Sequence, residues 1–303
     1  MGNSNWDPAS YGSYSRSVST KTREEIFTSR KLPEELDPAK FVIRESFDSP
    51  ANPESTPIIL SVDDTGSMGH LAELIIKTGL GTIMENIIAK KPVTDPHVCM
   101  SIFGDAYCDS APFQATQFEA DIALVKQIEK FYIESGGGGN NGESYMLPWF
   151  FAVNKTNCDA IRKHGRKGYI FTAGDENCLP LVTGDQIKRI FGITCEFKEL
   201  KSSDLLAICQ RDWEVFHLIT PTDATRQQDA INNWKKLLCE RAIVVEDWKR
   251  LPEIIVSLMQ VNEGQDKDDV VSAWDGDCQA VVKSAINNLP SKSKTPQAIV
   301  ETI

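Results

Sequence analysis

The chain has 303 residues, of which 41% are hydrophobic, enough to bury one large domain or two small ones. Its net charge is −11, and nucleic acids and anionic membranes both attract basic surfaces, so neither is expected as a partner. No apolar run approaches the ~20 residues of a membrane span, and residues 1–19 lack the apolar centre of a signal peptide. We therefore expect a cytoplasmic protein.

Cysteine and histidine usage excludes two further classes. The eight cysteines contain no C-x-x-C pair, and the four histidines do not cluster. Neither a zinc site nor a thioredoxin-like redox motif is therefore indicated. We expect the cysteines to be reduced and to pack as small apolar side chains.

The first 56 residues precede the main hydrophobic pattern. Residues 1–20 are rich in Ser, Tyr, Gly and Asn, a composition typical of a disordered or loosely attached arm. A short helix is expected within 24–36 and a strand at 41–46, followed by a proline-containing loop. We assign residues 1–56 to an N-terminal arm, partly disordered, that packs on the main domain.

The central feature is an apolar run at 58–62 that ends in Asp63 and Asp64. The run is short and β-branched, as in a strand buried on both faces of a parallel sheet. Residues 71–88 have helical periodicity, so a helix is expected at 69–90. The segment between them is a strand-to-helix turn, at the edge where open α/β sheets bind ligands. Asp63, Thr65 and Ser67 alternate, so one carboxylate and two hydroxyls can converge as an oxygen ligand set suited to Mg²⁺ or Mn²⁺.

The alternative interpretation of this segment is a helix N-cap at Ser67 with glycines forming a tight turn. It gives no reason for two adjacent acids at the end of a buried strand, where an unpaired carboxylate is costly. A bound metal ion supplies that reason.

Strands are next expected at 97–103 and 113–118, the second at the sheet edge, with Asp105 and Asp109 between them in a minor role. A helical pattern at 119–133 leads into residues 135–144, which contain four consecutive glycines. Glycine loses the most entropy when it is ordered, so we expect a loop that bends sharply or approaches a ligand. A flexible linker is the alternative; a P-loop is excluded because no G-K-[ST] follows.

The second half alternates between helices and strands. Helices are expected at 143–156, 184–191, 203–210, 224–238, 248–261 and 265–289, and strands at 167–172, 213–219 and 242–245. The alternation specifies an α/β, doubly wound and mainly parallel sheet, to which we add one antiparallel edge strand. We assign the main domain to 57–262, and a C-terminal helix with a mobile tail to 263–303.

Three segments together resemble one known family. Asp63-x-Thr65-x-Ser67, after an apolar strand and before a helix, resembles the first motif of the metal-ion-dependent adhesion site of von Willebrand factor A (vWA) domains. The Gly-rich segment resembles the second loop of that site and places Asn140 at its ligand position, where many members have Thr or Asp; Asn141 and Glu143 are alternatives. Asp175, after the strand at 167–172, resembles the third motif.

The resemblance implies a vWA-like, Rossmann-like sheet with helices on both faces. It also implies a Mg²⁺ or Mn²⁺ ion held by Asp63, Thr65 and Ser67, with Asp175 and Asn140 in the outer shell. It also implies a protein-binding module, not an enzyme, that captures an Asp or Glu of a partner protein. Intracellular bacterial and phage-borne members often act alongside AAA+ ATPases.

Two other functions remain open. A structural subunit of a phage or bacterial assembly, with a degenerate site, is suggested by Asn140 in place of the usual ligand. Asp63 with Asp175 and Glu176 also resembles the Mg²⁺-dependent haloacid-dehalogenase phosphatases, in which the Asp is a nucleophile. Those enzymes usually carry a second acid where this chain has Thr65.

Overall fold

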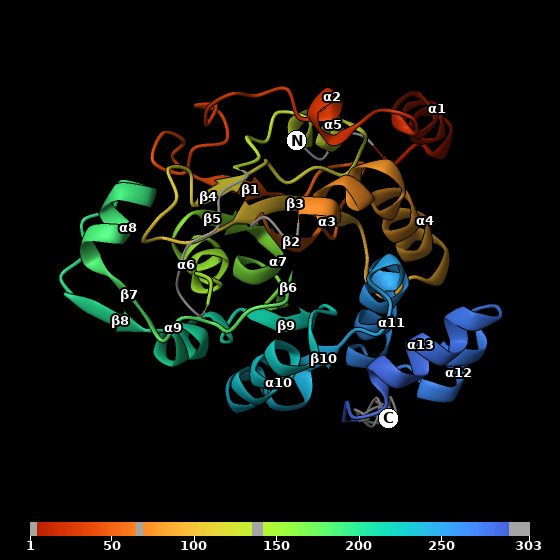
Figure 1. Cartoon of the computed structure of the whole chain (residues 1–303). Coiled ribbons are helices and arrows are strands. Elements are labelled where there is room, and N and C mark those ends of the chain that lie inside the picture. The colour runs from red at the N-terminus through yellow and green to blue at the C-terminus, as the bar shows by residue number, and fades with distance from the viewer. Residues whose placement is uncertain (1–4, 65–68, 135–141, 291–303) are drawn as a thin grey trace, which may run out of the picture.

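The central feature of the fold is a six-stranded sheet (Figure 1), seen in a computed structural model that describes residues 5–64, 69–134 and 142–290. Its strands are β2 Thr56–Asp63, β3 Pro96–Phe103, β4 Phe113–Ala115, β6 Gly168–Gly174, β9 Trp213–Ile219 and β10 Ala242–Val244. Their spatial order is β10-β9-β6-β2-β3-β4, and only β4, at one edge, runs antiparallel to its neighbour. The predicted α/β architecture, a doubly wound and mainly parallel sheet with an antiparallel edge strand, is confirmed.

Helices cover both faces of the sheet because β2 is apolar on both. Ile58, Leu60 and Val62 belong to one hydrophobic core and Ile59 to the other, as the alternation of side chains along a strand requires. The first core is built with α1 Pro8–Val18, α2 Arg23–Ile26, α3 Gly69–Leu74, α4 Leu80–Lys90, α5 Ala123–Ile128, α11 Leu251–Asn262, α12 Lys267–Ser272 and α13 Asp277–Ile286. The second is built with α6 Met146–Asn154, α7 Asp159–Arg162, α8 Gly184–Phe191, α9 Ser202–Cys209 and α10 Ala224–Leu238.

The N-terminal segment forms an ordered helix, α1, where the composition predicted a loose arm. Asp7 caps the helix by accepting hydrogen bonds from the first-turn amides of Ala9 and Ser10. Tyr11 is buried against α4 at Gly81, where a Cβ atom would lie 2.2 Å from the tyrosine ring. Aromatic burial and a cap therefore order a segment that is polar on average.

The helix predicted over residues 69–90 is interrupted by a π-helical turn at Ile75–Gly79, between α3 and α4. The hydroxyl of Ser15 in α1 donates a hydrogen bond of 2.5 Å to the carbonyl of Lys77 within that turn. The Lys77 ammonium in turn donates to the carbonyl of Lys21 at 2.8 Å. The N-terminal segment thus bonds directly to the irregular part of the helix that follows the Asp63 turn.

Several predicted bounds differ from the structure. Helix α5 is shorter than the predicted 119–133, and the predicted helix at 265–289 is split into α12 and α13 at Gly276, whose φ is +51°. Two small sheets accompany the main one. In the first, β1 Arg44–Ser46 pairs with β5 Thr156–Cys158, and in the second, β7 Leu181–Thr183 pairs with β8 Glu199–Lys201. Short 3-10 turns lie at Cys239–Arg241 and Trp248–Arg250. Strand β1 lies within the strand expected at 41–46, whereas the three-residue strands β5, β7 and β8 were not predicted, because such short strands carry little periodic signal.

Two of the eight cysteines, Cys108 and Cys239, are exposed and do not pack as the small apolar side chains that the sequence led us to expect. All eight cysteines are free thiols in the structure. Within the described ranges, no helix combines the length and the apolar composition that crossing a membrane requires.

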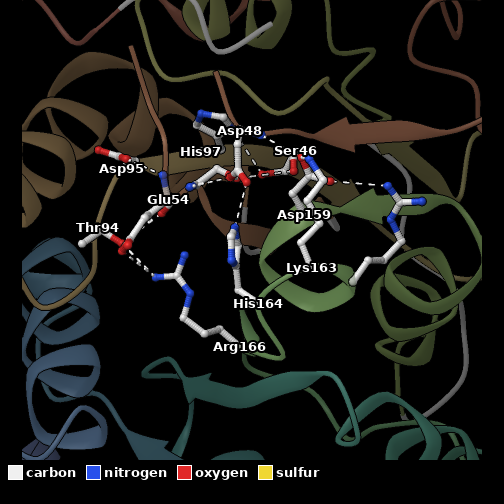
Figure 2. A network of polar contacts seen from close by, with 12 residues as sticks. Ser46, Asp48, Glu54, Thr94, Asp95, His97, Asp159, Lys163, His164 and Arg166 are labelled. Atoms are coloured by element: carbon white, nitrogen blue, oxygen red, sulfur yellow. Dashed lines mark hydrogen bonds and ion pairs between the residues drawn. The ribbon is translucent and has the colours of Figure 1, made fainter. Parts of the chain in front are cut away.

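A network of polar contacts joins the segments that enter the amino ends of β2, β3 and β6 (Figure 2). Asp48 accepts hydrogen bonds from the Ser55 hydroxyl at 2.8 Å and contacts His164 Nε2 at 2.8 Å. Asp159 accepts from the Asp48 backbone amide at 3.0 Å and from Lys163 Nζ at 2.6 Å. We call this network the amino-edge network.

Candidate functional site

Two of the predicted site residues lie together at the carboxyl edge of the sheet. Asp63 is the last residue of β2 and is fully buried, and Asp175 directly follows β6 and is also buried. Strands β2 and β6 are neighbours paired in parallel, with Val62 opposite Ala173. Numbered along the chain, the six strands have the order 3-2-1-4-5-6, and β2 and β6 flank the point where that order reverses. Doubly wound sheets bind their ligands at this point.

Tyr145 connects these two strand ends. Its hydroxyl donates a hydrogen bond to Asp63 Oδ2 at 3.2 Å and accepts one from the Glu176 backbone amide at 3.3 Å. Gly174 makes room for it, because a Cβ there would lie 2.1 Å from the Tyr145 hydroxyl and 3.0 Å from Asp63 Oδ2. Only glycine therefore fits at Gly174 without moving the tyrosine. Sequence reasoning missed Tyr145; its one signal was a phenol at the start of an otherwise apolar helix.

The other predicted ligands are not placed. Thr65, Ser67 and Asn140, and the fallback Asn141, lie outside the described residues. Within the described residues, no group of three or more His, Cys, Asp or Glu side chains is arranged to hold a metal ion. The metal site expected at this edge therefore stays a prediction.

Glu143, the second fallback, lies in a strongly acidic environment. Its side chain is 5% exposed, and its Oε2 atom has no hydrogen-bond partner among the described residues. Burial is the largest cause, and the charges of Asp63, Asp105 and Asp109 the next, of a rise in the pKa of this carboxyl to about 9. Glu143 thus lies among carboxylates, and its second oxygen is left for a ligand that the described chain does not supply.

Asp64, which follows Asp63 in the chain, is also buried. Its Oδ2 atom accepts a hydrogen bond from the Glu134 backbone amide at 3.1 Å, and its Oδ1 atom is buried without a hydrogen-bond partner in the described chain. Burial raises the pKa of Asp64 to about 8; the hydrogen bond from Glu134 opposes the shift, and the charge of Asp63 adds to it. Sequence reasoning gave this residue no role.

The loop after β3 brings two more acids to this edge and is held by many bonds. The Asp105 amide donates to Asp109 Oδ2 at 2.6 Å, and the Ala106 amide donates to the Ser144 hydroxyl at 2.9 Å. Arg189 donates to the carbonyls of Ala106 and Asp109. Asp105 is fully buried, and burial raises the pKa of Asp109. The loop therefore fixes its carboxyls beside Glu143 and does not merely expose them to solvent.

The donor set fits a hard cation. Carboxylates crowded at a buried strand end repel one another, and a divalent ion among them would relieve that repulsion. Glu143 Oε2, buried and lacking a hydrogen-bond partner in the described chain, is the observation that supports this fit. Oxygen-only ligands of this kind suit Mg²⁺ or Mn²⁺.

Comparison with known proteins gives distant likenesses only. No protein-family model and no curated protein matches the chain. Two solved structures of the pilus adhesin SpaC from Lactobacillus rhamnosus GG are similar over 72% of this chain, with 10% and 12% identity and TM-scores of 0.46 and 0.49. A von Willebrand factor type A protein from Catenulispora acidiphila is similar over 70%, with 10% identity and a TM-score of 0.37.

The matched regions span 31% and 32% of the adhesin chains and 43% of the Catenulispora acidiphila chain. This chain therefore corresponds to less than half the length of each of these proteins. The assignment of its fold rests on its own strand order and strand directions.

Proposed function

We propose that this chain is a metal-dependent protein-binding module. In the proposal, Asp63, Thr65 and Ser67 hold Mg²⁺ or Mn²⁺, with Asp175 and Asn140 in the outer shell, and a partner protein supplies an Asp or Glu to the ion. The observation that carries the proposal is the burial of Asp63 beside Asp175 at the reversal point of the strand order. With one carboxylate bound directly, the ion keeps enough positive charge to attract a second from outside.

Tyr145 acts in this proposal as a positioning residue. Its bond to Asp63 Oδ2 directs the other oxygen of that carboxylate away from the tyrosine. A hydrogen bond to one carboxylate oxygen restricts the orientation of the other, which is how outer residues tune a metal ligand. We propose that the chain binds and does not catalyse, that it is cytoplasmic, and that an AAA+ ATPase system is a candidate partner.

The first test is titration calorimetry with Mg²⁺ and Mn²⁺ on the full chain and on Asp63→Asn. The asparagine keeps an oxygen for the Tyr145 hydroxyl and removes the charge, so the fold should persist, which circular dichroism checks. Asp268→Asn, an exposed acid of α12, is the control with the same charge change. We expect binding in the parent and in Asp268→Asn, and a loss of at least about tenfold in affinity in Asp63→Asn.

A partner interaction, once captured, should then disappear on chelation and in Asp63→Asn. Interactions that survive both would contradict the proposal and favour the structural subunit with a degenerate site. Phosphatase activity that disappears in Asp63→Asn would instead favour the enzyme.

A further inference from the structure

A groove of about 850 Å³ lies beside the candidate site and takes no part in the metal binding proposed above. One wall is α10, and the other consists of the segment that follows Glu176, the start of β7, and the junction of β8 with α9. Figure 1 shows α10 and α9 on the same side of the molecule, with the β7 and β8 pair extending beyond them. We call this the α10 groove.

One face of α10 is directed into the groove. Asp229, Asn232, Asn233, Lys236 and Leu237 line it, and their spacing of three, four, seven and eight residues defines a single helical stripe. A different stripe, Ala230, Trp234 and Leu238, is buried against the sheet. The helix thus has one stripe that the fold uses and a second that faces a cavity.

The charges in the groove run against those of the chain as a whole. The chain has 43 acidic and 32 basic side chains, but the groove is lined by two lysines, Lys201 and Lys236, and by one acid, Asp229. Both lysines are exposed, and neither forms an ion pair with any residue that the structure describes. The apolar side chains of Leu179 and Leu237 lie between the polar ones. An acidic segment that carries an apolar residue complements this lining.

The groove and the candidate site share a wall. The Glu176 carbonyl accepts a hydrogen bond from Trp234 Nε1 at 3.0 Å, and the Cys178 amide donates to Asn233 Oδ1 at 3.1 Å, so the chain after Asp175 is fixed to α10. The same segment bonds to the other side of the site, because the Glu143 amide donates to the Asn177 carbonyl at 2.9 Å. A partner segment that extends from the proposed metal site along residues 175–178 therefore reaches the groove within a few residues.

We propose that the α10 groove binds an extended, acidic segment of the same partner that supplies the carboxylate to the metal. Lys201 and Lys236 pair with acidic side chains of that segment, and Leu179 and Leu237 receive an apolar one. The metal then selects for a carboxylate, and the groove selects for the sequence around it. This inference rests on the proposed function for the anchoring carboxylate, but its own evidence is the charge and shape of the groove.

The test is selection from a random peptide library displayed on phage, with the full chain as bait in Mg²⁺. Enriched peptides are synthesised, and their affinities are measured by fluorescence anisotropy for the parent, for Lys201→Glu/Lys236→Glu, and for Lys188→Glu/Lys235→Glu. The last pair is exposed and outside the groove, so it matches the charge change without touching the lining. All these positions are on the surface, so folding is preserved, and calorimetry checks that each variant still binds Mg²⁺.

We expect enriched peptides to combine acidic with apolar residues, and to lose about tenfold or more in affinity with the groove variant but not with the control variant. Replacing a glutamate of the peptide by lysine, at a position other than the anchoring one, should restore binding to the groove variant. Absence of enriched peptides, or equal loss in both double variants, would overturn the groove.

Asp63→Asn separates the two proposals. Peptides that discriminate between the double variants but bind Asp63→Asn and chelator-treated protein normally would retain the groove and overturn metal-dependent capture. Peptides that need Asp63 and Mg²⁺ but ignore the groove variant would do the reverse.

Discussion

Carboxylates are buried at both edges of the central sheet, but the contacts that surround them differ between the two edges. In the amino-edge network, Asp159 accepts bonds from Lys163 and from the Asp48 amide, and Asp48 contacts His164 (Figure 2). Burial alone would raise the pKa of Asp159 and of Asp48, but these bonds outweigh it and lower both. At the carboxyl edge, burial raises the pKa of Glu143 to about 9, and neighbouring carboxylates act in the same direction.

The comparison shows what a structural acid and a ligand-binding acid require of a fold. A structural carboxylate accepts hydrogen bonds from several donors, which stabilise its charge, and these bonds hold chain segments together. The carboxylates of the candidate site are instead gathered where the described chain leaves an oxygen of Glu143 without a donor. That arrangement costs stability unless something binds there.

The largest expected effect on stability is that of Asp159→Asn at the amino edge, compared with Glu143→Gln at the carboxyl edge. Asp159→Asn replaces an oxygen that accepts bonds with an amide that donates, so the Lys163 ammonium or the Asp48 amide loses its acceptor. We expect a loss of about 2 to 3 kcal/mol in the free energy of unfolding, measured with urea. Glu143→Gln, measured without divalent ions, should leave stability unchanged or raise it. Equal losses in the two variants would contradict the contrast between the edges.

Gly174→Ala tests the carboxyl edge by adding a methyl group where Tyr145 approaches the backbone. The added methyl group would lie 2.1 Å from the Tyr145 hydroxyl, so the tyrosine must move away from Asp63. We expect a loss of about 2 kcal/mol in stability, together with weaker Mg²⁺ binding by calorimetry. Adding Tyr145→Phe, which removes the clashing oxygen, should recover part of the stability but not the metal affinity.

Gly168→Ala, at the other end of the same strand, is the matched control. Its methyl group would lie 2.5 Å from the Trp213 ring, at the end of β6 opposite to the candidate site. It should lower stability and leave the metal affinity of the folded protein unchanged. A fall in metal affinity in both variants would mean that destabilisation alone is responsible.

The sequence predicted the periodic parts of the fold well, because their signals are local. The bounds of β9, α8 and α10 agree with the predicted 213–219, 184–191 and 224–238. Both helices begin at side-chain caps, Thr183 and Asp223, and β9 is a compact apolar run. The π-helical turn within the helix predicted at 69–90 was not predicted. Its residue Lys77 bonds to Ser15 and Lys21, which are distant in the sequence, so no local signal indicates the turn.

The candidate site was predicted in outline only. Asp63 and Asp175 could be identified because each lies at the carboxyl end of a strand, and parallel strands bring their carboxyl ends to one edge. Tyr145 could not, since its bond to Asp63 joins residues 82 positions apart and depends on the absence of a side chain at Gly174. The roles of Thr65, Ser67 and Asn140 remain predictions.

A third prediction concerns pH and two neutral histidines, one toward each edge. Burial lowers the pKa of His97, which contacts the Ser46 hydroxyl at 3.1 Å, and of His217, which stacks on Trp234 with ring centroids 3.6 Å apart. The histidines of the unfolded chain therefore bind protons at a pH at which those of the folded chain stay neutral. Each histidine lowers stability as the pH falls below the ordinary histidine pKa near 6.5.

Unfolding by urea between neutral pH and about pH 5 should show stability falling with a slope approaching 1.4 kcal/mol per pH unit for each histidine. His97→Gln and His217→Gln should each remove one such contribution to the slope. A slope that neither substitution changes would assign the acid sensitivity to carboxylates instead.

The smallest effect is expected at the exposed ion pair between Arg226 and Glu176, whose atoms are 3.5 Å apart. The arginine side chain is 60% exposed, so solvent screens the pair, and Arg226→Ala should change stability by less than about 0.5 kcal/mol. The backbone amide of residue 226, which the Asp223 side chain caps, is retained. Asp223→Ala, which removes that cap, should cost about 1 kcal/mol and serves as the comparison. An Arg226→Ala loss as large as that of Asp159→Asn would mean that the carboxyl edge is neutralised by a surface cation after all, and the case for a bound metal ion there would weaken accordingly.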